Sequence, residues 1–270
     1  MKNLLNRVMK FSKNNNNINI KPSLNTEINN NLLTICHGVL NGESLDFNLK
    51  DSRSFDLMNT ILFLGWGFHE YFLMTNYSIH DNALFVSIIH IMISIWQYVG
   101  LFIISHDLHH AEYPCLYENI LGRLSLFCYG GFMLEDFSQK HFKHHESPGI
   151  VEKDPDFYDG NIVLWYLNFL KNYVNIKQVI AQLLIYNLSN SLGISDEKMI
   201  LFWLMPSLLA SVQLFYYGTY LVHDKDGVIK NSNLPDWLIT ATSYNFGYHQ
   251  EHHKYPKVPW NKLRRDMSDK

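Results

Sequence analysis

The sequence has few cysteines and no pattern that would pair them. Cys36, Cys115 and Cys128 are odd in number and form no CxxC, so the chain matches neither a disulfide framework nor a cysteine-ligated zinc site. It also lacks an excess of charge, since 22 basic and 25 acidic residues give a net charge of −3. That balance gives no reason to propose nucleic acid as a partner. The first residues, MKNLLNRVMKF, lack the apolar core of a cleaved signal peptide.

Two familiar motifs for histidine-bound metals are also missing. A zinc hydrolase would contain HExxH, but the pairs His69-Glu70 and His145-Glu146 lack a second histidine four residues further on. Ferritin-like di-iron bundles use Glu and ExxH pairs, which do not occur here.

Long uncharged stretches are abundant instead. Residues 83–105 and 199–222 contain no Asp, Glu, Lys or Arg, and residues 58–79 contain only Glu70. Each stretch is long enough to cross a hydrocarbon core about 30 Å thick as a helix. These stretches exclude an ordinary soluble fold and predict a membrane protein.

Two further segments are weaker candidates. Lys171 and Lys177 interrupt the stretch 162–186, which predicts an interfacial segment at about 162–172 followed by a fourth span at about 173–188. Residues 117–134 carry Arg123 and two adjacent glycines, and this composition predicts a half-buried or re-entrant segment.

The four spans pair into two hairpins, 58–79 with 83–105 and 173–188 with 199–222. The predicted fold class is an all-α integral membrane protein with a histidine-rich cap. The N-terminus, the loop 106–160 and the C-terminal residues then share one side of the membrane. Basic residues concentrate on that side, whereas the opposite turns hold only Lys198. The basic residues on the shared side are Lys2, Arg7, Lys10, Lys140, Lys143, Lys257, Lys262, Arg264 and Arg265. Because Lys and Arg are enriched on the cytoplasmic side, we expect a multi-pass protein whose histidines face the cytoplasm.

The domain organisation follows from these spans. Residues 1–55 form a polar N-terminal tail whose Asn-rich part, 13–31, predicts disorder. Residues 56–265 form the membrane domain, and 266–270 are a short C-terminal tail.

Ten of the fourteen histidines fall in four short windows outside the spans. Positions i, i+3 and i+4 lie on one face of a helix, so HxxxH and HxxHH each direct imidazoles to one point. Imidazole suits iron, zinc and copper. The spacing gives nine candidate ligands: His106, His110, His141, His144, His145, His223, His249, His252 and His253.

Nine imidazoles are too many for one zinc ion and suffice for two metals with open positions. We therefore predict a histidine-rich di-iron site that activates O2. His109 lies one residue out of the HxxxH pair, and its role stays open. Four histidines lack metal spacing and are expected in the tail, at the interface or in the core: His37, His69, His80 and His90.

The histidine boxes resemble those of the membrane fatty-acid desaturase and hydroxylase superfamily. Finer features resemble the bacterial-type β-carotene ketolases, over about residues 58–265. These features are GLFIISHD, HFKHHESPGIVEKDPDF, LFYYGTYLVH and NFGYHQEHHKYPKVPW. The usual HDxMHG reads HDLHHA here, with His109 in place of Met and Ala111 in place of Gly.

This resemblance implies an O2-dependent di-iron enzyme that oxidises C4 of a carotenoid β-ionone ring to a ketone, with the nine histidines as ligands. The substrate would be an apolar polyene dissolved in the bilayer, and electrons would come from an external donor of the ferredoxin type. Lys262, Arg264 and Arg265 are candidates to dock an acidic donor, with an ordinary cytoplasmic charge cluster as the alternative. Aromatic residues that could line a ring pocket are Trp96, Tyr98, Phe102, Phe127, Tyr129, Trp165, Phe215 and Tyr216.

Four carboxylates near the boxes are expected to take part in the site. Asp107, Asp154, Asp156 and Glu251 could accept the second ring N–H of a ligand histidine and so fix its orientation. The alternative for each is a surface charge or a helix cap.

Two other functions remain open from the sequence. One is a fatty-acyl desaturase or hydroxylase of the same superfamily. The other is a non-catalytic membrane protein that binds or transports metal, which predicts histidines inside the spans rather than at their ends.

Overall fold

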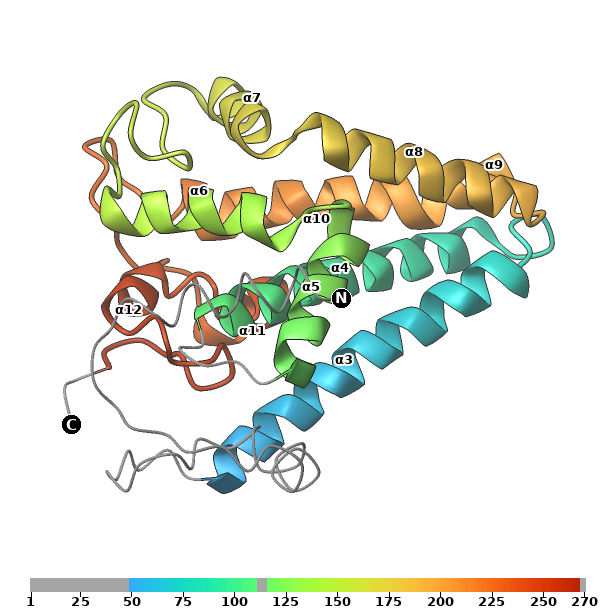
Figure 1. Ribbon diagram of the computed structural model, residues 1–270, viewed down its shortest axis with the longest axis horizontal. Coiled ribbons are helices and arrows are strands. Elements are labelled where there is room, and N and C mark those ends of the chain that lie inside the picture. Colours follow the sequence, from blue (N-terminus) through green and yellow to red (C-terminus); the bar gives the residue numbers. More distant parts are fainter. Residues whose placement is uncertain (1–48, 111–115, 268–270) are drawn as a thin grey trace, which may run out of the picture. The chain divides into compact units, whose positions relative to one another are not determined.

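The computed structural model describes residues 49–110 and 116–267, with side chains described from residue 57 onward (Figure 1). All of these residues belong to one compact unit, Glu43–Lys270. The predicted Asn-rich tail, Cys36 and Cys115 lie outside the described residues. Within the described ranges, the structure consists of helices and loops without a β-strand.

The first predicted hairpin is formed by two long helices, α3 (Leu49–Thr75) and α4 (Leu84–His110). Helix α4 does not end with its apolar run but continues through SHDLHH. The first histidine box therefore lies on the last turns of this helix. The span predicted at 58–79 ends earlier than expected, at Thr75.

The region predicted as half-buried forms α5 (Leu116–Gly130), followed by α6 (Leu134–Glu146). Gly131 has a positive φ of 76° and separates the two helices, a conformation that glycine adopts without strain. Helix α6 has Glu135 and Asp136 in its first turn and Lys143 in its last, which complements the helix dipole.

A helix break separates the predicted interfacial segment from the predicted fourth span. Helix α7 covers Ile162–Tyr173 and α8 covers Ile176–Ser191. The side chain of Asn161 caps the first by accepting from Val163 N and Leu164 N, and Asn175 caps the second by accepting from Gln178 N. These caps satisfy backbone donors that have no partner inside the helix.

The last long helical run changes its hydrogen-bond pattern three times. It comprises α9 (Asp196–Lys198), the π-helix η2 (Met199–Leu204), α10 (Met205–Phe215) and the π-helix η3 (Tyr216–Tyr220). Pro206 is the second residue of α10, in the first turn after η2. Because proline has no N–H and its ring crowds the preceding turn, the wider π-helical turn accommodates it. Two short helices complete the chain, α11 (Asp236–Ser243) and α12 (His249–Lys254).

The turns of the two helical hairpins meet at one end of the unit. Lys198 Nζ donates to the carbonyl of Met74 at 3.0 Å, and His80 Nε2 lies 3.2 Å from Glu197 Oε2. Figure 1 shows α6, α11 and α12 at the other end, where α4 and the run through α10 terminate. The long helices thus position the histidine-containing segments at the same end of the unit.

Two helical runs among the described residues are long and apolar enough to cross a membrane, Leu84–His110 and Asp196–Tyr220. The outer faces are apolar on other helices too. Phe68 of α3 is 75% exposed and Leu184 of α8 is 66% exposed, whereas Glu70 and Ser94 are buried inside. Apolar residues outside and polar residues inside are typical of a protein that contacts lipid.

Two loops cross at glycines beside the histidine-rich end. Gly149 and Gly227 have φ values of 69° and 76°. A Cβ added at Gly149 would lie 1.9 Å from the carbonyl oxygen of Gly227. The same loop presents Gly149 N to Asp154 Oδ2 at 2.6 Å, so the crossing also positions a carboxylate of the site described below.

We expect Gly149→Ala to lower the unfolding free energy by at least about 2 kcal/mol, because the new methyl group adds a backbone clash to the cost of a positive φ. Gly193→Ala is the matched control, since Gly193 has φ 87° but no atom within 4 Å of an added Cβ. Thermal denaturation in detergent measures both. Equal losses in the two variants would contradict a structural role for the loop crossing.

Candidate metal centre

Four segments far apart in the sequence bring the nine predicted ligands together. Helix α4 supplies His106 and His110, and α6 supplies the box-two histidines. The segment after η3 supplies His223, and α12 supplies the box-three histidines. Spacing along a helix explains why box members share a face, and the fold places these faces against one another.

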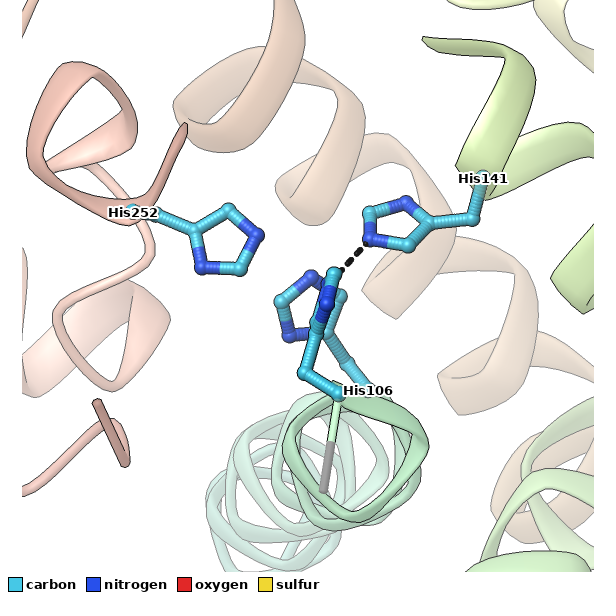
Figure 2. A group of neighbouring side chains, drawn as sticks. His106, His141 and His252 are labelled. Atoms are coloured by element: carbon cyan, nitrogen blue, oxygen red, sulfur yellow. Dashed lines mark hydrogen bonds between the residues drawn. The ribbon is translucent and has the colours of Figure 1, made fainter. Parts of the chain in front are cut away.

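The first cluster consists of His106, His110, His141 and His252. One ring nitrogen from each lies within 4.8 Å of the others. Figure 2 shows the rings of His106, His141 and His252 directed toward one another from three different segments. His110 Nε2 lies 2.7 Å from His141 Nε2. His145 joins this cluster, because its Nε2 lies 3.1 Å from the Nε2 atoms of both His141 and His252.

The second cluster consists of His144, His223 and His249, again with nitrogens within 4.8 Å of one another. His253 adds a fourth ring. The Nε2 atoms of His144, His249 and His253 form a triangle with sides of 3.0, 2.9 and 3.2 Å.

Hydrogen bonds alone do not account for this triangle. An imidazole nitrogen either carries a proton and donates, or carries a lone pair and accepts. Among three nitrogens in mutual contact, at least two have the same state, so at least one side of the triangle is repulsive. A cation bound by all three lone pairs removes the conflict.

The spacing and the unpaired nitrogens both fit a metal. Two nitrogens that each lie about 2.1 Å from one ion, at a right angle, are about 3 Å apart, which matches the triangle. His106 Nε2 and His223 Nε2 are buried and have no hydrogen-bond partner among the described residues. A buried polar atom without a partner is costly, and both residues belong to the clusters.

A backbone contact fixes which nitrogen of His223 can bind. His223 Nδ1 lies 2.7 Å from the carbonyl oxygen of Thr219, and only a protonated nitrogen can donate to a carbonyl. The lone pair is therefore on Nε2, within the second cluster. Thr219 belongs to the π-helix η3, a type of turn often found at functional sites.

Two of the four predicted carboxylates contact histidines of the predicted ligand set. Asp154 Oδ1 lies 2.8 Å from His144 Nδ1, and Asp107 Oδ1 lies 3.2 Å from His106 Nδ1. Asp107 also accepts from the backbone N–H of Trp260 at 2.6 Å. This contact ties the segment after box three to box one.

The other two predicted carboxylates are placed differently. Asp156 Oδ2 is 4.0 Å from His144 Nδ1, and its Oδ1 accepts from the Tyr173 hydroxyl. Glu251 is buried, and its Oε2 has no partner among the described residues. Its expected contact with a ligand histidine therefore stays a prediction.

Burial keeps most of these imidazoles neutral, the form that binds metal. It lowers the pKa of His249 and His252 well below the usual value and lowers the pKa of His145 and His223 to about 4. His144 differs. Burial lowers its pKa, but the carboxylates of Asp156 and Asp154 outweigh burial and leave the pKa raised.

The remaining described histidines lie outside the two clusters. His109 Nδ1 lies 3.0 Å from Ser138 Oγ. His69 Nε2 is 3.0 Å from His90 Nδ1, between α3 and α4, and His80 is at the hairpin turns. Three contacts were not expected from the sequence. No pattern marks Tyr173 or the Thr219 carbonyl, and the PKVPW motif contains Trp260 without indicating its backbone contact.

Comparison with known proteins identifies the class. Residues 178–267 match the family model for fatty acid desaturases, so the helical unit with its buried histidine clusters is a protein of the desaturase and hydroxylase superfamily. Two proteins of Paracoccus sp., strains N81106 / MBIC 01143 and PC1, are named beta-carotene ketolase and are each 36% identical to this chain. The matches cover 62% and 63% of this chain and 74% of each relative.

A beta-carotene ketolase of Haematococcus lacustris is 31% identical, over 62% of this chain and 57% of the relative. The chain belongs to the beta-carotene ketolase family. The resemblance inferred from the histidine boxes is thereby confirmed.

We expect Asp154→Asn to weaken metal binding about 10- to 100-fold, because an amide no longer holds His144 by a charge-assisted hydrogen bond. Asp159→Asn is the matched control, since Asp159 is an exposed acid in the same loop. Titration with a chelator, followed by metal analysis, measures both variants. An Asp154→Asn protein that holds metal as tightly as the control would remove Asp154 from the site.

Proposed function

We propose that this protein is an O2-dependent di-iron oxygenase of the membrane that converts the C4 methylene of a carotenoid β-ionone ring to a ketone. Its membership of the beta-carotene ketolase family supports the substrate and the reaction. The observation that carries the proposal is the convergence of the ring nitrogens of His144, His249 and His253, which hydrogen bonds alone cannot satisfy.

The distances divide the nine ligands between two iron ions. His106, His110, His141, His145 and His252 would hold one, and His144, His223, His249 and His253 would hold the other. Both sets consist of imidazole alone, a ligand that suits iron. The count leaves open positions for O2.

The iron pair, when bound, supplies the activation of O2 and the removal of hydrogen from the allylic C4 carbon. The chain itself positions the ligands and excludes water. Asp154 and Asp107 orient His144 and His106. Phe102 and Phe246 pack against the His106 ring, with centroids 6.0 and 4.9 Å away, and keep this side of the cluster apolar.

Two successive hydroxylations of the same carbon give a geminal diol, which loses water to leave the ketone. Each round consumes one O2, two electrons and two protons and releases one water. The ring must therefore stay in place between rounds, which calls for a closely fitting apolar site. The electrons come from an external donor. A ferredoxin-type protein would dock at the basic segment with Lys262, Arg264 and Arg265.

The proposed membrane topology has four spans in two hairpins within the domain 56–265. The meeting of both hairpin turns at one end supports it, as do the exposed apolar residues of α3, α4, α8 and α10. Among the described residues, the segments that carry or follow the histidine boxes contain Lys140, Lys143, Lys257, Lys262, Arg264 and Arg265, and this end would face the cytoplasm. The tails 1–55 and 266–270 lie outside this domain.

Expression in a bacterial host that makes β-carotene tests the activity directly. We expect chromatography to show a mono-ketone and a di-ketone, echinenone and canthaxanthin, with unchanged acyl chains in the host lipids. An unchanged carotene pool together with new double bonds or hydroxyls in the acyl chains would identify a fatty-acyl desaturase or hydroxylase instead.

In the same host, we expect His144→Ala to abolish both iron loading and ketone formation, because it removes one vertex of the nitrogen triangle. His80→Ala serves as the control, since His80 is exposed at the hairpin turns. Full activity in His144→Ala would exclude His144 as a ligand.

A further inference from the structure

An apolar cavity lies directly beside the first histidine cluster. Its walls come from α4, α5, α6, α7 and α10, and it is lined by aromatic side chains that include Phe102, Tyr129, Phe137 and Phe246. Among the described residues, His141 is the one histidine that lines the cavity, and Asp156 and Thr219 line it as well. Phe102 and Tyr129 were among the aromatic residues expected at a ring pocket.

An open groove continues from this cavity along α8 and α10. The groove shares five lining residues with the cavity: Tyr129, Phe132, Leu170, Val174 and Ser211. Its walls are one face of α8, with Gln178, Gln182 and Tyr186, and one face of the η2–α10 run, with Leu204, Leu208 and Ser211. Positions four residues apart share a helix face, so the groove runs parallel to both helices.

Helix α8 is tied to its neighbours across the groove by side-chain hydrogen bonds. Gln178 Nε2 donates to the Gly130 carbonyl, and Trp203 Nε1 donates to Gln182 Oε1, each at 2.9 Å. Leu183 and Leu208 line the groove and are both 56% exposed. Its mouth therefore lies among the apolar residues that would contact lipid.

We propose that cavity and groove form one binding site, entered sideways from the bilayer, for a rigid linear polyene that ends in a six-membered ring. The ring lies in the cavity and the polyene chain lies between α8 and α10. Along the helix axis, Leu204 to Thr219 spans about 22 Å at about 1.5 Å per residue. A long, narrow, apolar channel of this kind suits a conjugated chain, which cannot fold back on itself.

This inference rests on the proposed function and makes it more specific. The ring would lie nearest to His141, the one described histidine that lines the cavity, and so beside the metal position of the first cluster. The reacting carbon is thereby placed at one of the two metals. The cavity is more enclosed than the groove, so it would also hold the ring between the two rounds of oxidation.

Ser211 sits where the cavity and the groove join. Its hydroxyl lies 2.7 Å from the Tyr166 hydroxyl and 2.7 Å from the carbonyl oxygen of Leu208. These contacts hold a small side chain against the wall and leave the passage open. A phenyl ring at this position would close it.

The test compares Ser211→Phe with Val212→Phe, the next residue on α10, which is 41% exposed and lines neither space. A second pair is Leu208→Trp with Leu209→Trp, since both leucines are exposed but only Leu208 lines the groove. Each protein is purified from β-carotene-producing cells. Retained carotene per chain, iron per chain and ketone yield are measured.

We expect Ser211→Phe to lose at least about tenfold in both retained carotene and ketone yield while iron stays at the wild-type level, because a misplaced substrate costs orders of magnitude in rate. Leu208→Trp should show a smaller loss of the same kind, and the two controls should match wild type. Wild-type pigment retention and ketone yield in both Ser211→Phe and Leu208→Trp would overturn the binding site. Carotene that the wild type retains and both Ser211→Phe and Leu208→Trp lose, without ketone formed by any of them, would support the site and contradict the ketolation.

Discussion

The structure depends on one electrostatic constraint, the convergence of imidazole nitrogens that cannot all be hydrogen-bonded to each other. The Nε2 atoms of His144, His249 and His253 meet at 2.9 to 3.2 Å. Any assignment of protons leaves at least one pair with two donors or two acceptors. Without a cation, the cluster would push α6 and α12 apart. With a cation, the same atoms join them.

Several features serve this convergence. The π-helix η3 ends the last long helix so that the Thr219 carbonyl selects the tautomer of His223. The crossing of the loops at Gly149 and Gly227 positions Asp154 so that its carboxylate contacts His144 Nδ1. These contacts orient the imidazole rings and would not bind the metal themselves. Hydrogen-bond partners of this kind fix the geometry of a metal site. The site lies at helix ends. Under the proposed function, a substrate dissolved in lipid would approach it through the apolar cavity, while iron and electrons would arrive from water.

Local sequence patterns predicted individual helices and which histidines share a helix face. Packing between segments far apart in the sequence determined which histidines meet. The HxxHH spacing predicted that His141, His144 and His145 share a face of α6, and the uncharged stretches predicted α4 and the run through α10. The pattern could not show that His141 and His145 belong to one cluster and His144 to the other, because that depends on how α12 docks. Neither could it reveal the Thr219 and Trp260 backbone contacts, since any residue type supplies a carbonyl or an N–H. The break at 174–175 was predictable because Lys171 and Lys177 mark the end of the interfacial segment.

The central claim is that two irons are bound by two separate sets of histidines. Diffraction from crystals of the iron-loaded protein, recorded on both sides of the iron absorption edge, tests it most directly. We expect two anomalous peaks per chain. One should lie at bonding distance from nitrogens of the set His106, His110, His141, His145 and His252, and the other at bonding distance from nitrogens of the set His144, His223, His249 and His253. A single peak, no peak, or peaks away from these rings would contradict it.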